Sequence, residues 1–154
     1  MQKIGYLIIL IAIALIVYLK YPRKITKTIK QEIGNTVFSL EVADNLYLHG
    51  KGLSGRKELC SECGMIFVFP FESFQSFWMK DTLIPLDIIF IDKNGNITDI
   101  YTALPEPYKS DLELSFYQST KAVKYVIELN SGQANKLNLK KGDNIKIDLN
   151  FYAT

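Results

Sequence analysis

The sequence has little histidine, cysteine or tryptophan, which limits the chemistry that it can support. His49 is its one histidine, and Cys60 and Cys63 are its only cysteines. A four-ligand zinc site would need Glu58, Glu62 or a second chain to complete it, so we expect no metal or other cofactor. Serine-type catalysis is also disfavoured, because no G-x-S-x-G motif occurs and the single histidine would have to be the base. Flanked by glycine, that histidine is expected to be a surface residue.

Acidic residues are absent from residues 1–30, which contain six basic residues. From Gln31 onward the chain has 12 basic and 16 acidic residues, so the remainder is acidic overall. Nucleic-acid binding needs clustered lysine and arginine at the binding surface. Because the only such cluster lies beside a hydrophobic segment, we interpret it as a membrane-flanking patch and expect no nucleic-acid partner.

Charge is missing altogether from the hydrophobic run Ile4–Leu19. In a helix these 16 residues reach roughly 24 Å, short of a hydrocarbon core of roughly 30 Å, and the flanking Lys3 and Lys20 can extend the span. No small residues follow the run where a signal peptide would be cut, so an uncleaved signal anchor is favoured. We therefore predict a single-pass membrane protein with a transmembrane anchor at residues 1–20.

Two features of this anchor argue for opposite orientations. The excess of lysine and arginine after it favours a cytoplasmic domain under the positive-inside rule. The preceding tail is only three residues long and carries Lys3 and the terminal amine, as in a signal anchor that exports the domain after it. From these residues alone both orientations stay open.

The rest of the chain divides into a linker and one domain. Residues 21–35 are expected to form a basic linker, since they contain Pro22 and Gly34-Asn35 and show no sustained periodicity. A globular domain is expected over residues 36–154. Six of its segments have the alternation or the apolar run typical of strands, and Pro70 is expected to end the second of them. These segments are Phe38–Val42, Met65–Phe69, Leu86–Asp92, Ile97–Tyr101, Ala122–Leu129 and Ile145–Leu149.

One or two short helices are expected between these strands. Asp44 can cap a helical turn through about Leu48, and Ser131 can cap a helix through Leu139. The pair Asn94-Gly95 predicts a tight hairpin turn. Together these elements predict the α+β class: a compact β-rich single domain of about six strands in a barrel-like or twisted sheet, preceded by one N-terminal transmembrane helix.

Several blocks of the sequence carry a family resemblance. They are Gly52-Leu53-Ser54-Gly55-Arg56, Gly64–Phe69, Phe77-Trp78-Met79-Lys80-Asp81-Thr82 running into Pro85–Asp92, Val123–Leu129 with Gly132, and Gly142-Asp143. In this order the chain resembles, over roughly Thr36 to Leu149, the family catalogued as domain of unknown function 192. The resemblance implies a compact β-rich domain, often on exported or membrane-attached proteins. It implies no known reaction and no catalytic residue.

The resemblance also bears on orientation and on two individual features. Because relatives are often exported, it favours an extracytoplasmic domain, though weakly. Asp81 stands where the family usually has asparagine. The pair Cys60 and Cys63 is not part of the family's pattern.

The segment Ser76–Asp92 combines bulky aromatic and charged residues where a plain strand would alternate. Trp78 offers a flat face for stacking a sugar ring or a base, and Lys80 offers a donor to an anionic group. Asp81 or Asp87 offers an acceptor. The alternative is that the aromatic residues belong to the core, the lysine pairs with a carboxylate, and Asp87 accepts backbone N–H bonds.

The loop before Gly64 contains two features that each allow more than one interpretation. Arg56 can act as a fork for a carboxylate or phosphate, or can hold the loop by bonding carbonyl groups. Cys60 and Cys63 are spaced as a local disulfide, as free or catalytic thiols, or as half of a metal site. The disulfide is favoured if the domain is exported.

Two functional hypotheses result from these features. The favoured one is a membrane-tethered module that binds an unknown small ligand or a protein in a groove lined by Trp78, Lys80 and Arg56. The alternative is an enzyme that acts on a polar or carbohydrate-like substrate with Asp87 or Glu128, both on predicted central strands, as acid/base. A binding module predicts an open groove without a desolvated carboxylate, whereas an enzyme predicts a closed pocket in which burial raises the pKa of a carboxylate.

Overall fold

The structure, a computed structural model, describes residue 6 and residues 27–149 of the 154-residue chain. The anchor expected at residues 1–20 lies outside the described residues except for Tyr6, as do residues 21–26 of the expected linker. Within the described part, no helix is both long and apolar enough to cross a bilayer.

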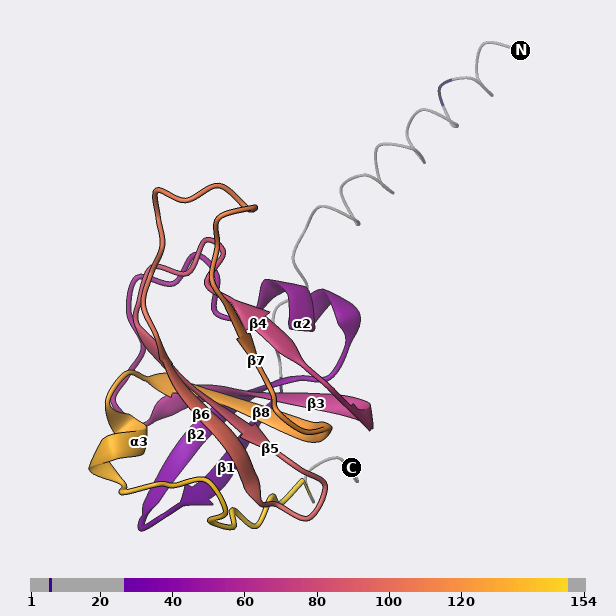
Figure 1. The fold of residues 1–154 in the computed structure, drawn as a ribbon, viewed down its shortest axis with the longest axis vertical. Coiled ribbons are helices and arrows are strands. Elements are labelled where there is room, and N and C mark those ends of the chain that lie inside the picture. Colours follow the sequence, from indigo (N-terminus) through magenta and orange to yellow (C-terminus); the bar gives the residue numbers. More distant parts are fainter. Residues whose placement is uncertain (1–5, 7–26, 150–154) are drawn as a thin grey trace.

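The described residues form a mixed six-stranded sheet, a two-stranded ribbon and two short helices (Figure 1). The strands are β1 (Thr28–Ile33), β2 (Thr36–Ala43), β3 (Cys63–Ser73), β4 (Ser76–Trp78), β5 (Leu86–Ile91), β6 (Ile97–Ala103), β7 (Phe116–Gln118) and β8 (Val123–Asn130), and the helices are α2 (Leu46–Lys51) and α3 (Gln133–Lys136). The large sheet has the order β1-β2-β3-β8-β5-β6, and β4 pairs with β7. The expected compact β-rich domain is therefore confirmed, with six strands in its main sheet and two more in the ribbon.

Strand direction determines where the connections run. β2 and β3 are parallel, whereas the other neighbours in the sheet are antiparallel. A parallel pair needs a crossover connection that returns the chain to the starting end of the sheet. This crossover, residues 44–62, contains α2 and the loop with Cys60.

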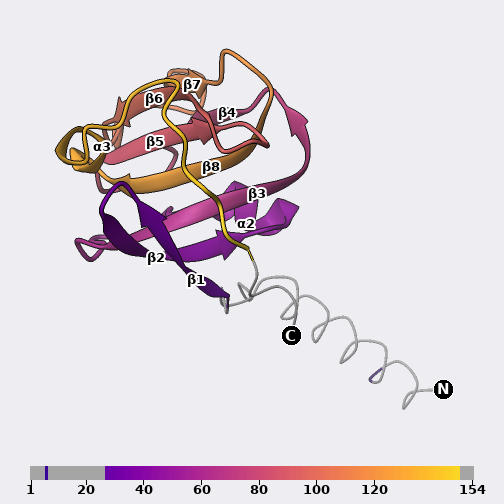
Figure 2. The same cartoon turned by 90° about the horizontal axis from the view of Figure 1, so that it is seen from below.

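Both faces of the sheet are buried. Side chains alternate between the faces, so Met65 and Phe67 in β3 belong to one apolar cluster and Ile66 to the other. The first cluster also contains Leu48 of α2 and is packed by Phe77 of β4. The second is covered by α3 and by the C-terminal segment, which runs across the strands in Figure 2.

β1 corrects the expected start of the domain, because the sequence pattern places Thr28–Ile33 in the linker. It pairs along its whole length with β2 and buries Ile29, Gln31 and Ile33 on one side. The central buried position holds a polar residue, which hid the alternation. Its side-chain amide donates to the carbonyl of Lys146 at 3.0 Å and accepts from the N–H of Asp148 at 3.2 Å.

The C-terminal segment also differs from expectation. Residues 145–149, expected to be a closing strand, form no strand; only Asn144 makes a single bridge, to Asn96. The alternating apolar residues Ile145 and Ile147 do contact the second cluster. The segment crosses the face of the sheet, and the side chain of Gln31 takes the place of a neighbouring strand's backbone.

The helices have other bounds than expected, because their caps lie elsewhere. α2 continues to Lys51, past the expected end near Leu48, whereas α3 is shorter than expected and ends at Lys136. Asn45 caps α2 in place of Asp44, with its Oδ1 accepting from the N–H of Leu48 at 3.1 Å. Gly132 precedes α3 with φ 89° in the left-handed region, so Ser131 cannot begin that helix.

Two strand assignments also need correction. Pro70 does not end β3, which continues to Ser73 through an irregularity in its pairing with β8. Proline is tolerated at such bulges, where its missing N–H removes no ladder bond. The ribbon of β4 and β7 was not expected, since each strand has only three residues.

Gly64 lies where β2, β3 and β8 pack closely together, so a substitution at this position tests the packing between them. A Cβ atom at this position would lie 2.6 Å from the carbonyl oxygen of Glu128 and 2.7 Å from the Cδ2 atoms of Leu40 and Leu129. We expect Gly64→Ala to lower the free energy of unfolding by about 1–3 kcal/mol through overpacking, measured by chemical denaturation. Gly50→Ala in α2 is the control, because no heavy atom lies within 4 Å of its Cβ position. An equal loss in both variants would contradict this explanation.

Candidate functional site

A cavity of about 120 Å³ lies between α2 and the face of the sheet that carries the first apolar cluster. Its walls come from the end of α2 and the turn after it, from β3, from β4 and the turn after it, and from β8. The lining residues that bear on its chemistry are His49, Lys51, Phe67, Phe69, Trp78, Lys80 and Glu128. Segments distant in the sequence therefore meet at one small site.

Glu128 forms the polar part of this cavity's wall. It lies in β8 between Met65 of β3 and Ile88 of β5, both fully buried. Its residue is 5% exposed, and its Oε2 atom is the one buried side-chain polar atom without a hydrogen-bond partner in residues 27–149. Because buried polar atoms nearly always have partners, an unpartnered atom in a cavity wall marks a candidate site.

Burial governs the ionisation of this carboxyl group. Removal from water disfavours the charged form, and it raises the pKa of Glu128 from 4.5 to about 8. The group is therefore mostly protonated at neutral pH. Its Oε2 also lies 4.0 Å from the place that a side-chain Cβ would take at Gly52, so the chain passes close to it there.

Trp78 and Lys80 line the same cavity and contact each other. The Lys80 Nζ lies 5.5 Å from the centre of the Trp78 ring, which stacks against Phe116 at 5.8 Å. Lys80 also forms an ion pair with Asp111, and this hydrogen bond raises the pKa of Lys80 above its usual value. The two residues named together from the sequence thus lie together in space.

His49 lines the cavity as well, although we expected only a surface histidine. Its ring is half-buried and packs 4.6 Å from the ring of Phe69. Its Nε2 lies 3.1 Å from the carbonyl oxygen of Ala43. A carbonyl can only accept, so we assign a proton to Nε2, which leaves Nδ1 available in the neutral ring. Neither His49 nor Lys51 was expected at this site, because flanking glycines suggested a loop.

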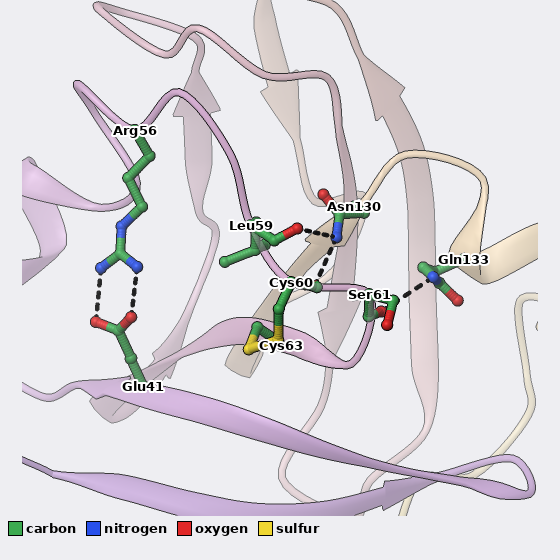
Figure 3. Close-up of a disulfide and its surroundings, with 8 residues drawn as sticks. All are labelled: Glu41, Arg56, Leu59, Cys60, Ser61, Cys63, Asn130 and Gln133. Atoms are coloured by element: carbon green, nitrogen blue, oxygen red, sulfur yellow. Dashed lines mark hydrogen bonds and ion pairs between the residues drawn. A yellow bond between two sulfur atoms is a disulfide. The ribbon is translucent and has the colours of Figure 1, made fainter.

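Arg56 does not line the cavity, although the hollow that it lines shares Lys51 and Gly52 with it. Its guanidinium donates two parallel hydrogen bonds to the Glu41 carboxylate, at 2.5 and 2.6 Å (Figure 3). It lines a different hollow, of about 770 Å³, beside Cys60 and Cys63. The expected groove of Trp78, Lys80 and Arg56 is therefore not formed as one surface.

Asp87 and Glu128 do not form a pair of acids. Asp87 lies opposite Leu129 in the register of β5 and β8, so its side chain points to the other face of the sheet. It is 1% exposed and accepts hydrogen bonds from the N–H of Ala134 and the Oγ1 of Thr102, both at 2.8 Å. By accepting this backbone N–H, Asp87 fixes the start of α3. Accepting backbone N–H bonds is the role expected of Asp87 if it does not bind a ligand.

Asp81 is exposed and is not among the residues that line the cavity. Its φ of 53° lies in the left-handed region, which asparagine and aspartate enter more readily than other residues except glycine. Its carbonyl accepts from the N–H of Gly55 at 2.8 Å. The backbone conformation accounts for an asparagine or aspartate at this position.

Cys60 and Cys63 form a disulfide, with their sulfur atoms 1.97 Å apart. The loop that they close is also tied to the sheet by side chains from β8 and α3. The Nδ2 of Asn130 donates to the carbonyl of Cys60 at 2.8 Å, and the Nε2 of Gln133 donates to that of Ser61 at 3.1 Å (Figure 3). With both sulfur atoms in this bond, neither is a thiolate ligand or a free nucleophile.

The raised pKa of Glu128 predicts how stability depends on pH. The unfolded chain releases this proton near pH 4.5, whereas the folded chain keeps it to about pH 8. The stability that it contributes is therefore full below pH 4.5 and is lost as pH rises to 8. Relative to Glu128→Gln, the free energy of unfolding of the unaltered protein should fall by about 3 kcal/mol between pH 4 and pH 7.

Chemical denaturation of both proteins at several pH values measures this difference. Glu62→Gln is the matched control, because Glu62 is exposed and does not line the cavity. It should change the pH dependence of stability little. A constant difference between the unaltered protein and Glu128→Gln across this range would show that the carboxyl is ionised in the folded state.

Comparison with known proteins places this fold among uncharacterised relatives. A protein of unknown function from Novosphingobium aromaticivorans DSM 12444 is 31% identical with a TM-score of 0.71, over 82% of this chain and 90% of that one. A protein from Sinorhizobium meliloti 1021, provisionally named as a transcription regulator, is 31% identical with a TM-score of 0.65, over 72% and 82%. No curated protein matches. The sequence profile of the family DUF192, described as "Uncharacterized ACR", matches residues 26–147, so this protein belongs to the family of domain of unknown function 192.

Proposed function

We propose that this domain binds a small polar ligand in the cavity at Glu128, and that the chain is tethered to a membrane by its N-terminal segment. The observation that carries the binding proposal is the unpartnered, buried Oε2 atom of Glu128 in the cavity wall. Leaving such an atom without a partner costs about 1–3 kcal/mol. A ligand atom that hydrogen-bonds to this carboxyl would remove the penalty.

The size of the cavity limits the ligand. An engineered apolar cavity of about 150 Å³ holds benzene, and the cavity here has a volume of about 120 Å³. A whole sugar ring, with roughly twice the non-hydrogen atoms of benzene, would not fit inside. The ligand is therefore a very small molecule, or one end of a larger one whose remainder lies outside, near Trp78.

Proton transfer by Glu128 is a second candidate function, and one observation favours it. A carboxylate with a raised pKa in a small pocket is the feature expected of an enzyme rather than of a plain binding module. Burial holds the pKa of Glu128 near 8, which suits a general acid at neutral pH. His49 lines the same cavity and is a second group that can carry a proton. Binding is the common requirement of both functions, so it is tested first.

The proposed site can be tested with the protein's single tryptophan. Trp78 lines the cavity, so its fluorescence reports on occupancy. We expect members of a library of small polar compounds to change the fluorescence of the full chain in detergent micelles in a saturable way. Glu128→Leu should reduce the affinity at least tenfold by removing the hydrogen bond, and should still fold, since it replaces an unpartnered polar group by an apolar one.

The control is Glu62→Leu, which makes the same substitution at an exposed position. It should bind as the unaltered protein does. Equal binding by Glu128→Leu and the unaltered protein, or no saturable change with any compound, would refute the proposed site.

The location of the domain is proposed to be extracytoplasmic. The disulfide Cys60–Cys63 supports this side, since such bonds persist in oxidising compartments and are rare in the cytosol. Family relatives that are often exported support it as well. The basic residues at positions 20–30 remain the feature that favours the opposite orientation.

Thiol labelling in intact cells distinguishes the two orientations. A membrane-impermeant maleimide should label the chain only after an impermeant reductant opens the disulfide, because both cysteines are paired. A variant with Cys60→Ser and Cys63→Ser is the control and should not be labelled. Labelling that requires disruption of the membrane would place the domain in the cytoplasm.

A further inference from the structure

The charged side chains that line the cavity are of one sign at neutral pH. Four titratable residues line it: His49 and Lys51 from α2, Lys80 after β4, and Glu128 from β8. The part contributed by β3 is aromatic, with Phe67 and Phe69. The only acid among the lining residues is mostly protonated at neutral pH, so two lysines supply the formal charge of the lining. Asp111, which is not a lining residue, pairs with one of them, Lys80.

We propose that the group bound in this cavity is a carboxylate, which accepts a hydrogen bond from the Glu128 carboxyl and is attracted by Lys51 and Lys80. This inference rests on the proposed function and names the ligand's chemistry. A neutral carboxyl is a hydrogen-bond donor, and a carboxylate is its strongest common partner, with O–H···O⁻ bonds of about 2.5–2.7 Å. Two carboxyl groups in contact share one proton, because both cannot ionise side by side.

An ammonium ligand fits this site less well. It would need Glu128 to ionise among apolar neighbours and would approach past Lys51 and Lys80. Aromatic rings can attract a cation, but the Trp78 ring already has the Lys80 ammonium 5.5 Å from its centre. The neighbouring Phe67 ring is packed edge-on against Phe77, with centroids 4.8 Å apart.

The remaining walls define the rest of the ligand. Beside the carboxylate, about 120 Å³ leaves room for only a short aliphatic part against Phe67 and Phe69. Two kinds of molecule have this chemistry: a free short-chain acid, and the C-terminal carboxylate of a peptide whose remainder lies outside the cavity.

Ligands of matched size and different charge test this inference. Propionate, propionamide and propylammonium are titrated into the full chain in detergent micelles, with Trp78 fluorescence as the readout. Propionate should bind at least tenfold more tightly than the other two. Its affinity should fall about tenfold from pH 7 to pH 9, since Glu128, with a pKa of about 8, loses the donated proton over this range.

Variants separate the roles of the residues. Glu128→Gln should make propionate affinity lower and independent of pH, because an amide donates a weaker hydrogen bond and does not titrate. The double variant Lys51→Gln, Lys80→Gln should bind several-fold more weakly than the control Lys57→Gln, an exposed lysine that does not line the cavity. Circular dichroism confirms that each variant is folded.

The outcomes distinguish this inference from the proposed function. Tighter binding of propylammonium, or propionate binding that ignores pH and both lysines, would refute the carboxylate while leaving the cavity a binding site. No saturable response to these or to the compound library would refute both.

A peptide that binds tightly with a free C-terminus, and weakly when amidated, would identify a chain end as the ligand, whereas binding of propionate alone would identify a free acid. Either result supports the inference.

Discussion

The pleat of β8 is the constraint on which the arrangement of both sheet faces depends. The strand is bonded to β3 on one side and β5 on the other, so its backbone cannot rotate without breaking two ladders. Val126 and Glu128 must point to one face, and Ile127 and Leu129 to the other. A one-residue slip would bury Glu128 in the opposite cluster and expose its apolar neighbours to the cavity. Packing of the surrounding side chains thus keeps the Glu128 carboxyl away from water, in which it would ionise at neutral pH.

The strands that the sequence predicted correctly are those in which the side chains alone reveal the pattern. β5 has a fully buried run and is followed by an Asn-Gly turn into β6, as expected. β1 could not be recognised, because its central buried position is Gln31, whose partner is the backbone of residues far along the chain. The C-terminal residues showed the reverse: their alternation reflects burial, but after the N–H of Ile145, which bonds the carbonyl of Gly95, no described strand pairs with them.

The sequence identified several residues of the candidate site but not how they are arranged in space. Trp78 and Lys80 are close in sequence and meet at one cavity wall. The sequence predicts Glu128 only as one of two acids on central strands. Whether Asp87 faces Glu128 depends on the register between β5 and β8. A shift of one residue moves a side chain to the other face of the sheet, and the sequence of one strand alone does not fix this register. The partner of Arg56 is Glu41 on a neighbouring strand, a contact that likewise depends on tertiary packing.

The crossover between the parallel strands β2 and β3 supplies one wall of the cavity, including His49 and Lys51. Unlike the strands, this connection has no ladder partner that fixes its length. Insertions, deletions or substitutions within it can reshape the wall while the sheet and the buried carboxyl keep their positions. Changes confined to this one segment would therefore alter the size and charge of the cavity without moving Glu128.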